Sequence, residues 1–254
     1  EIKEGVDPGL LSGLMISQSI ALPITIMILL TYSMQIAATS VAMEKEEKTL
    51  ETLLTLPVDR FAILMGKLSG SIVVSGVGAI AYMIGFNYYM NSLTTVYSRP
   101  GTSLDLVSLG LVPSLLGYFL LGVSLFVALL SALALAVIIS AFAEDVRSAQ
   151  SVVGYIYPLI FIPSFLLLYL DINTIPFAIR IILYAIPYSH PILASKAVIM
   201  GDYWTPVFGI LYVAAFTLVV MYIASRLFAT EKILTAKLKF RGLRKRGKAP
   251  VEEF

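Results

Sequence analysis

Five apolar stretches, each long enough to cross a lipid bilayer, dominate this sequence. They cover about residues 15–41, 63–90, 113–142, 152–170 and 207–228. A spanning helix needs about 20 mostly apolar residues. Only 13% of the residues are charged, against about 25% in soluble domains. The backbone polar groups of a chain in lipid must bond within the chain, and helices achieve this. The sequence therefore predicts an all-α membrane protein, a polytopic helical bundle with five spans.

The bundle is expected to occupy residues 1–230, followed by a basic cytoplasmic tail over 231–254. Between the fourth and fifth spans, an apolar stretch is interrupted by Pro176, Pro187 and Pro191. We expect two short helices there, over about 174–199, that enter the outer interface without crossing. A sixth span ending near Ile199 is the alternative. Pro158 and Pro163 are expected to kink the fourth span, because a proline cannot donate a backbone hydrogen bond.

The basic residues indicate which side of the membrane each loop occupies. If the segments 44–67, 144–147 and everything after Arg226 share one side, that side holds 14 of the 18 basic residues. The positive-inside rule makes this the cytoplasmic side. The C-terminus is then cytoplasmic and residue 1 is outside, with the tail lying on membrane lipid. A chain that begins outside without a signal peptide leads us to expect a further span before residue 1.

The sequence contains few residues that could carry chemistry of their own. There is no cysteine, and His190 is the single histidine. We find no metalloprotease motif and no phosphate-binding loop. The span interiors hold essentially no ionisable residue, which argues against a proton relay. We therefore predict no catalytic residue, no metal, no cofactor and no nucleic-acid partner for this chain, and we expect its energy to come from another protein. An intramembrane enzyme, or an ATP-independent channel or scaffold, is the alternative.

One polar stretch, residues 44–57, separates the first two spans. It begins with the glutamates Glu44, Glu46 and Glu47 and then becomes apolar at helical spacing, with Leu50, Leu53, Leu54 and Pro57 at positions i, i+3, i+4 and i+7. We expect a short amphipathic helix that ends at Pro57. Another protein could bind this helix and move the chain through it, or the helix could simply join two spans.

Residues 44–67, EKEEKTLETLLTLPVDRFAILMGK, resemble the signature of the membrane subunits of type-2 ATP-binding-cassette (ABC) exporters. In place of the glycine that often precedes the threonine of this signature, the chain has Lys48. Two further segments, SAFAEDVRSAQS at 140–151 and AIPYSHPILA at 185–194, look like later landmarks of the same family. Among its members, the chain is most similar to the sodium-extrusion-permease-like subgroup.

This resemblance implies a six-span permease in the cell membrane that exports a substrate from the cytoplasm. It implies pairing with a second permease subunit, as a homodimer or heterodimer, and docking of two ABC ATPase subunits that bind ATP and Mg. The helix at 44–57 would be the coupling helix. Its implied ATPase contacts are Glu44, Glu46, Glu47, Thr49, Leu50, Glu51, Leu53, Leu54 and Pro57. A second cytoplasmic contact would involve Glu144, Asp145 and Arg147.

Overall fold

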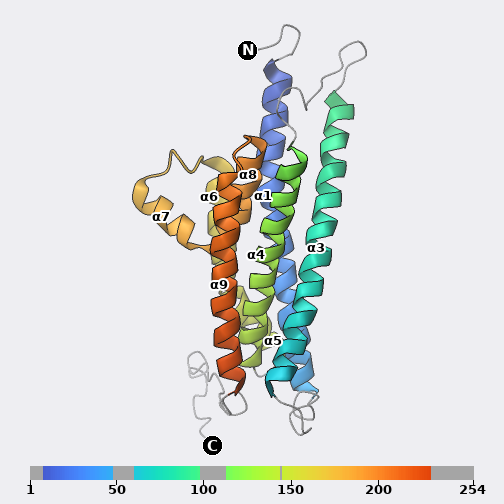
Figure 1. Ribbon diagram of the computed structural model, residues 1–254, viewed down its shortest axis with the longest axis vertical. Helices are drawn as coiled ribbons and strands as arrows, with labels where there is room; N and C mark the ends of the chain where they lie inside the picture. The colour runs from blue at the N-terminus through green and yellow to red at the C-terminus, as the bar shows by residue number, and fades with distance from the viewer. Residues whose placement is uncertain (1–7, 48–59, 98–112, 144, 230–254) are drawn as a thin grey trace, which may run out of the picture.

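A computed structural model describes residues 8–47, 60–97, 113–143 and 145–229. These residues form helices and connecting turns, with no strand among them (Figure 1). Within this part of the chain, five segments are long and apolar enough to cross a membrane. The all-α, polytopic architecture expected from the sequence is thereby confirmed. The long helices are α1 (Pro8–Glu46), α3 (Arg60–Tyr97), α4 (Leu115–Ala141) and α9 (Trp204–Ala229).

Helix α4 lies at the centre of the bundle. In its most apolar window 61% of the residues are buried, against 28% in each of the other four candidate spans. Helices α1, α3 and α9 all pack against it. The buried face of α4 is rich in small residues, which let helix backbones approach closely in lipid. These small buried residues are Gly117, Ser124, Ala128, Ser131, Ala132, Ala134, Ala136 and Ser140.

The fourth span consists of two helices, α5 (Val146–Gly154) and α6 (Tyr157–Tyr169). The break falls directly before Pro158, which occupies the first turn of α6. A proline inside a helix lacks the N–H that would bond to residue i−4, here Gly154, the last residue of α5, whereas its missing N–H costs nothing in a first turn. Pro163 lies inside α6. The irregularity expected at Pro158 is thus a two-residue interruption, and the two helices together still form one candidate span, Val146–Tyr169.

Two short helices occupy the proline-rich region before the last span, as expected. They are α7 (Phe177–Ala185) and α8 (His190–Ile199), joined by a 3-10 turn, η1 (Pro187–Ser189). The chain bends by 95° between them, and the count of spans rises to six if this bent pair is one span. Helix α7 projects from the bundle (Figure 1). Helix α8 differs from the expected interfacial helix, because eight of its ten residues are buried and it packs on α4 and α9.

The helix ends gather at two opposite ends of the bundle. The end of α1, the start of α3, the end of α4, the start of α5 and the end of α9 lie at the lower end in Figure 1. The start of α1, the end of α3 and the start of α9 lie at the upper end. The described parts of the segments to which the sequence assigned one common side therefore meet at one end of the molecule. We call this lower end, with Lys67, Arg147 and Arg226, the basic end.

Candidate interaction site at the basic end

The first acidic residues of the predicted coupling segment are part of α1. Glu44 and Glu46 lie in the last turn of this helix, which continues without a break from the first span. The segment contains no proline or glycine between Val41 and Glu47, and alanine, methionine, glutamate and lysine are good helix formers. Thr49, Leu50, Glu51, Leu53, Leu54 and Pro57 lie outside the described residues, as does Glu144. Their predicted contacts stay predictions.

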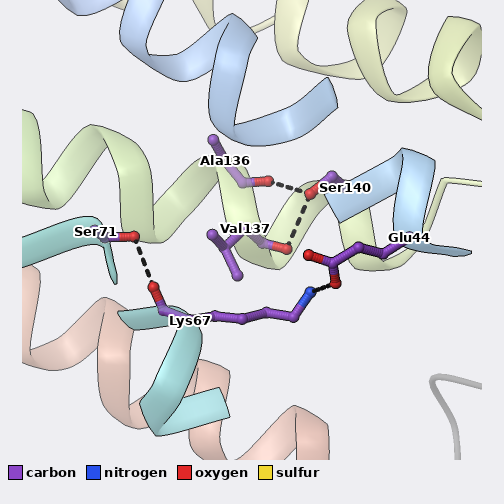
Figure 2. A network of polar contacts seen from close by, with 6 residues as sticks. All are labelled: Glu44, Lys67, Ser71, Ala136, Val137 and Ser140. Carbon is purple, nitrogen blue, oxygen red and sulfur yellow. Dashed lines mark hydrogen bonds and ion pairs between the residues drawn. The ribbon is translucent and has the colours of Figure 1, made fainter. Parts of the chain in front are cut away.

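The end of α1 is held between two other helices. The Glu44 carboxylate forms an ion pair with the Lys67 ammonium group of α3 (Figure 2). Two residues later, Glu46 Oε2 accepts a hydrogen bond from the Val146 backbone N–H at 3.4 Å. That N–H is at the start of α5, where unpaired amides and the helix dipole favour a carboxylate. Any displacement of the end of α1 therefore acts on both α3 and α5.

The second predicted contact lies next to the first. Asp145 immediately precedes α5, so the Glu46 contact brings part of the 44–57 segment to the 145–147 segment. Arg147 is exposed there. The structure thus brings Glu46 to Asp145 and Arg147, which lie about 100 residues further along the sequence. Glu47 is also exposed, at the described end of the segment.

Asp145 has a structural role that the sequence analysis did not assign. Its Oδ1 accepts a hydrogen bond from the Ser148 backbone N–H at 2.6 Å, and its own N–H donates to Ser148 Oγ at 3.0 Å. This is a capping box at the start of α5. The hydrogen bond from the Ser148 N–H, together with the other donors of the turn and the Arg147 charge, lowers the pKa of the Asp145 carboxyl group. The carboxylate therefore holds its own helix start, and its availability to a partner is limited.

Further polar contacts join α1 to the broken span. Gln150 of α5 donates to Thr39 Oγ1 at 3.4 Å, and the Tyr157 hydroxyl of α6 donates to Gln35 Oε1. Thr39 and Gln35 are one turn apart on α1, so they share a face. Nothing in the sequence assigned a partner to any of these side chains, or to Lys67.

The described residues contain no group of His, Asp or Glu side chains that could hold a metal ion. The bundle is that of a polytopic α-helical membrane protein, with an ion pair between α1 and α3 and a contact between α1 and the start of α5 at its basic end. Residues 10–226 match the family model described as ABC-2 family transporter protein, and the chain belongs to that family.

Membership of this family makes the chain a membrane component of an ABC transporter and not itself an enzyme. Permeases of this family usually work with an ATPase subunit, which supports that kind of partner. A comparison with curated proteins found no match. The narrower likeness to the sodium-extrusion subgroup stays a prediction.

Proposed function

We propose that this chain is the permease subunit of an ABC exporter and that a separate ATPase supplies its energy. The supporting observation is the family match over residues 10–226, which includes the whole polar segment 44–57. In this proposal two ATPase subunits, each with bound ATP and Mg, dock at the basic end. A second permease subunit completes the membrane part, as a homodimer or heterodimer.

The segment 44–57 acts in this proposal as the coupling helix. Leu50, Leu53 and Leu54 supply the apolar face that seats on the ATPase, and the glutamates orient it. Movement of the ATPase would pass through this segment to the end of α1. The Glu44–Lys67 ion pair and the Glu46–Val146 hydrogen bond would then carry it to α3 and α5. The contact with Glu144, Asp145 and Arg147 would add a smaller, mainly electrostatic surface.

The direction of transport is part of the proposal. The concentration of basic residues in the segments 44–67, 144–147 and after Arg226 supports a cytoplasmic location for these segments in the cell membrane, with residue 1 outside and the C-terminus inside. A coupling helix on the cytoplasmic side can reach an ATPase that uses cellular ATP. Export of a substrate from the cytoplasm is the activity that fits this arrangement and the family resemblance.

The experiment that tests this proposal places charges on the apolar face of the segment. In Leu53→Asp/Leu54→Asp, the two leucines that would enter the ATPase groove become charged, so we expect the ATPase to be lost from the purified complex and ATP-dependent transport to fall at least tenfold. Thr52→Asp/Thr55→Asp is the matched control, because it adds the same charges on the opposite face of the helix. Intact complex and transport in the leucine variant would show that this segment is not the docking site.

A further inference from the structure

A groove runs along the bundle between α1 and α3, with α4 as its floor. Its volume is about 310 Å³, at the lower end of the range for small-molecule sites. On α1 it extends from Glu44 to Ser33. These residues are eleven positions apart, about 16 Å along a helix. The groove is therefore long and narrow, and it begins at the basic end.

The walls of the groove are made of small and apolar side chains. Ser33 and Ala37 line it from α1, Gly70 from α3 and Leu133 from α4. At its edge, Ile36 of α1 is 66% exposed. Because α1, α3 and α4 are all candidate spans, the surroundings of this opening are lipid hydrocarbon. An apolar chain can enter the groove sideways from the bilayer.

The groove has a charged end. The Glu44–Lys67 ion pair forms it, and the two side chains are 37% and 14% exposed, respectively (Figure 2). A lysine ammonium group has three donors, so Lys67 can bind an additional acceptor beside Glu44. The carboxylate and ammonium groups side by side favour a ligand that carries both charges. A purely anionic ligand would be attracted by Lys67 but repelled by Glu44.

The size of the groove indicates that a lipid chain fits inside it and a protein helix does not. A helix with its side chains is about 10–12 Å wide, so a 16 Å length of it displaces on the order of 1,300 Å³. This is roughly four times the volume of the groove. A helix would rest on the edges and leave the groove empty, whereas a single acyl chain is narrow enough to lie inside it.

We propose that this groove binds one phospholipid with a zwitterionic head group that carries a primary ammonium, such as phosphatidylethanolamine. The phosphate contacts Lys67, the ammonium donates to Glu44, and one acyl chain lies along α1 toward Ser33. The head group then sits at the end of α1, next to the basic end. This binding does not depend on the ATPase, and it stands or falls separately from the proposed function.

Two glycines of α3 allow a matched test of the groove. A Cβ built on Gly70 or on Gly85 meets nothing within 4 Å, and both residues are exposed, but only Gly70 lines the groove. Gly70→Phe should fill the groove, whereas Gly85→Phe makes the same change 15 residues further along the helix. We expect native mass spectrometry to find one phosphatidylethanolamine per chain in the unmodified protein and in Gly85→Phe, with at least a tenfold loss in Gly70→Phe.

Head-group selection provides a second, independent measurement. After exchange into vesicles of equal parts phosphatidylethanolamine and phosphatidylglycerol, the unmodified protein should retain the former in excess. Glu44→Gln removes the carboxylate and should lose this preference while still binding lipid. Equal lipid retention by Gly70→Phe and Gly85→Phe, or a preference for phosphatidylglycerol in the unmodified protein, would overturn the proposal. So would a change of oligomeric state in Gly70→Phe without loss of lipid, because the groove would then be a protein contact.

Discussion

A Cβ atom added to Gly117 of α4 would lie 2.5 Å from Cγ1 of Val198 in α8. The two helices therefore meet at this point only because residue 117 has no side chain. The Ser114 and Tyr203 hydroxyl groups are hydrogen-bonded nearby at 2.8 Å. The start of α4 is thus fitted closely to the region that precedes the last span, and this close approach places α8 inside the bundle.

Gly117→Ala should destabilise the protein. Overpacking of this kind costs about 1–3 kcal/mol, and Val198 is 2% exposed, which leaves it little room to move. The higher helix propensity of alanine returns about 1 kcal/mol. We expect a net loss on the order of 1 kcal/mol and a lower melting temperature in a thermal unfolding scan.

The control for this substitution is Gly85→Ala, where the new Cβ meets nothing within 4 Å. It gains the same propensity without the clash, so its melting temperature should stay the same or rise slightly. Equal melting temperatures for the two variants would contradict the close contact between α4 and α8.

Tyr212→Phe should loosen the bend between α7 and α8. The Tyr212 hydroxyl of α9 donates to the Ala185 carbonyl oxygen at 2.6 Å, at the last residue of α7. Losing this hydrogen bond should cost about 1 kcal/mol. We expect faster hydrogen exchange at residues 185–189, measured by mass spectrometry. Tyr169→Phe is a suitable comparison, because that side chain is 79% exposed. Unchanged exchange in Tyr212→Phe would mean that this bond does not hold the bend.

The start of α5 should lose stability in acid. The Ser148 N–H and its neighbours lower the pKa of Asp145 in the folded protein, compared with an ordinary value of about 3.9. A carboxyl group whose pKa is lowered by folding stabilises the folded state at every pH above its ordinary pKa. This stabilisation is lost as the pH falls through the lowered, folded-state pKa. The backbone amides of residues 146–149 should therefore become less protected from hydrogen exchange in that acidic range, after correction for the intrinsic pH dependence of exchange.

Asp145→Asn provides the comparison, because an asparagine side chain also caps a helix start but does not titrate in this range. Its corrected exchange at 146–149 should not change with pH. The same acid response in both proteins would assign the loss of protection to another group.

Arg147→Glu tests the second proposed contact with the ATPase. Arg147 is exposed beside the Glu46–Val146 contact. Reversing a charge at the edge of an interface mainly changes the association rate and the salt dependence. We expect several-fold weaker binding of the ATPase at low salt and a smaller difference at high salt, measured by surface plasmon resonance. Arg226→Glu makes the same charge change on α9 at the same end, and equal effects of the two variants would argue against a local contact.

The positions of the spans could be predicted from the sequence. Predicted spans at 113–142 and 207–228 correspond to Leu115–Ala141 and Trp204–Ala229, and those at 15–41 and 63–90 lie within α1 and α3. The length of each apolar stretch determines where a span lies, because the solvent around the protein is lipid. Successive spans cross the membrane in alternate directions, so the sequence also predicted that the helix ends near Lys67, Arg147 and Arg226 lie at the same end.

The partners of individual side chains were decided only by the tertiary structure. Nothing in the sequence paired Glu44 with Lys67, Glu46 with the Val146 N–H, or Tyr212 with Ala185. In water, a polar face shows how a helix is rotated. Here α4 and its neighbours α1, α3 and α9 do not separate a polar from an apolar face, so the sequence does not reveal which face meets which. Packing of small residues such as Gly117 decides that rotation, and with it the burial of α8 and the position of the groove beside Gly70.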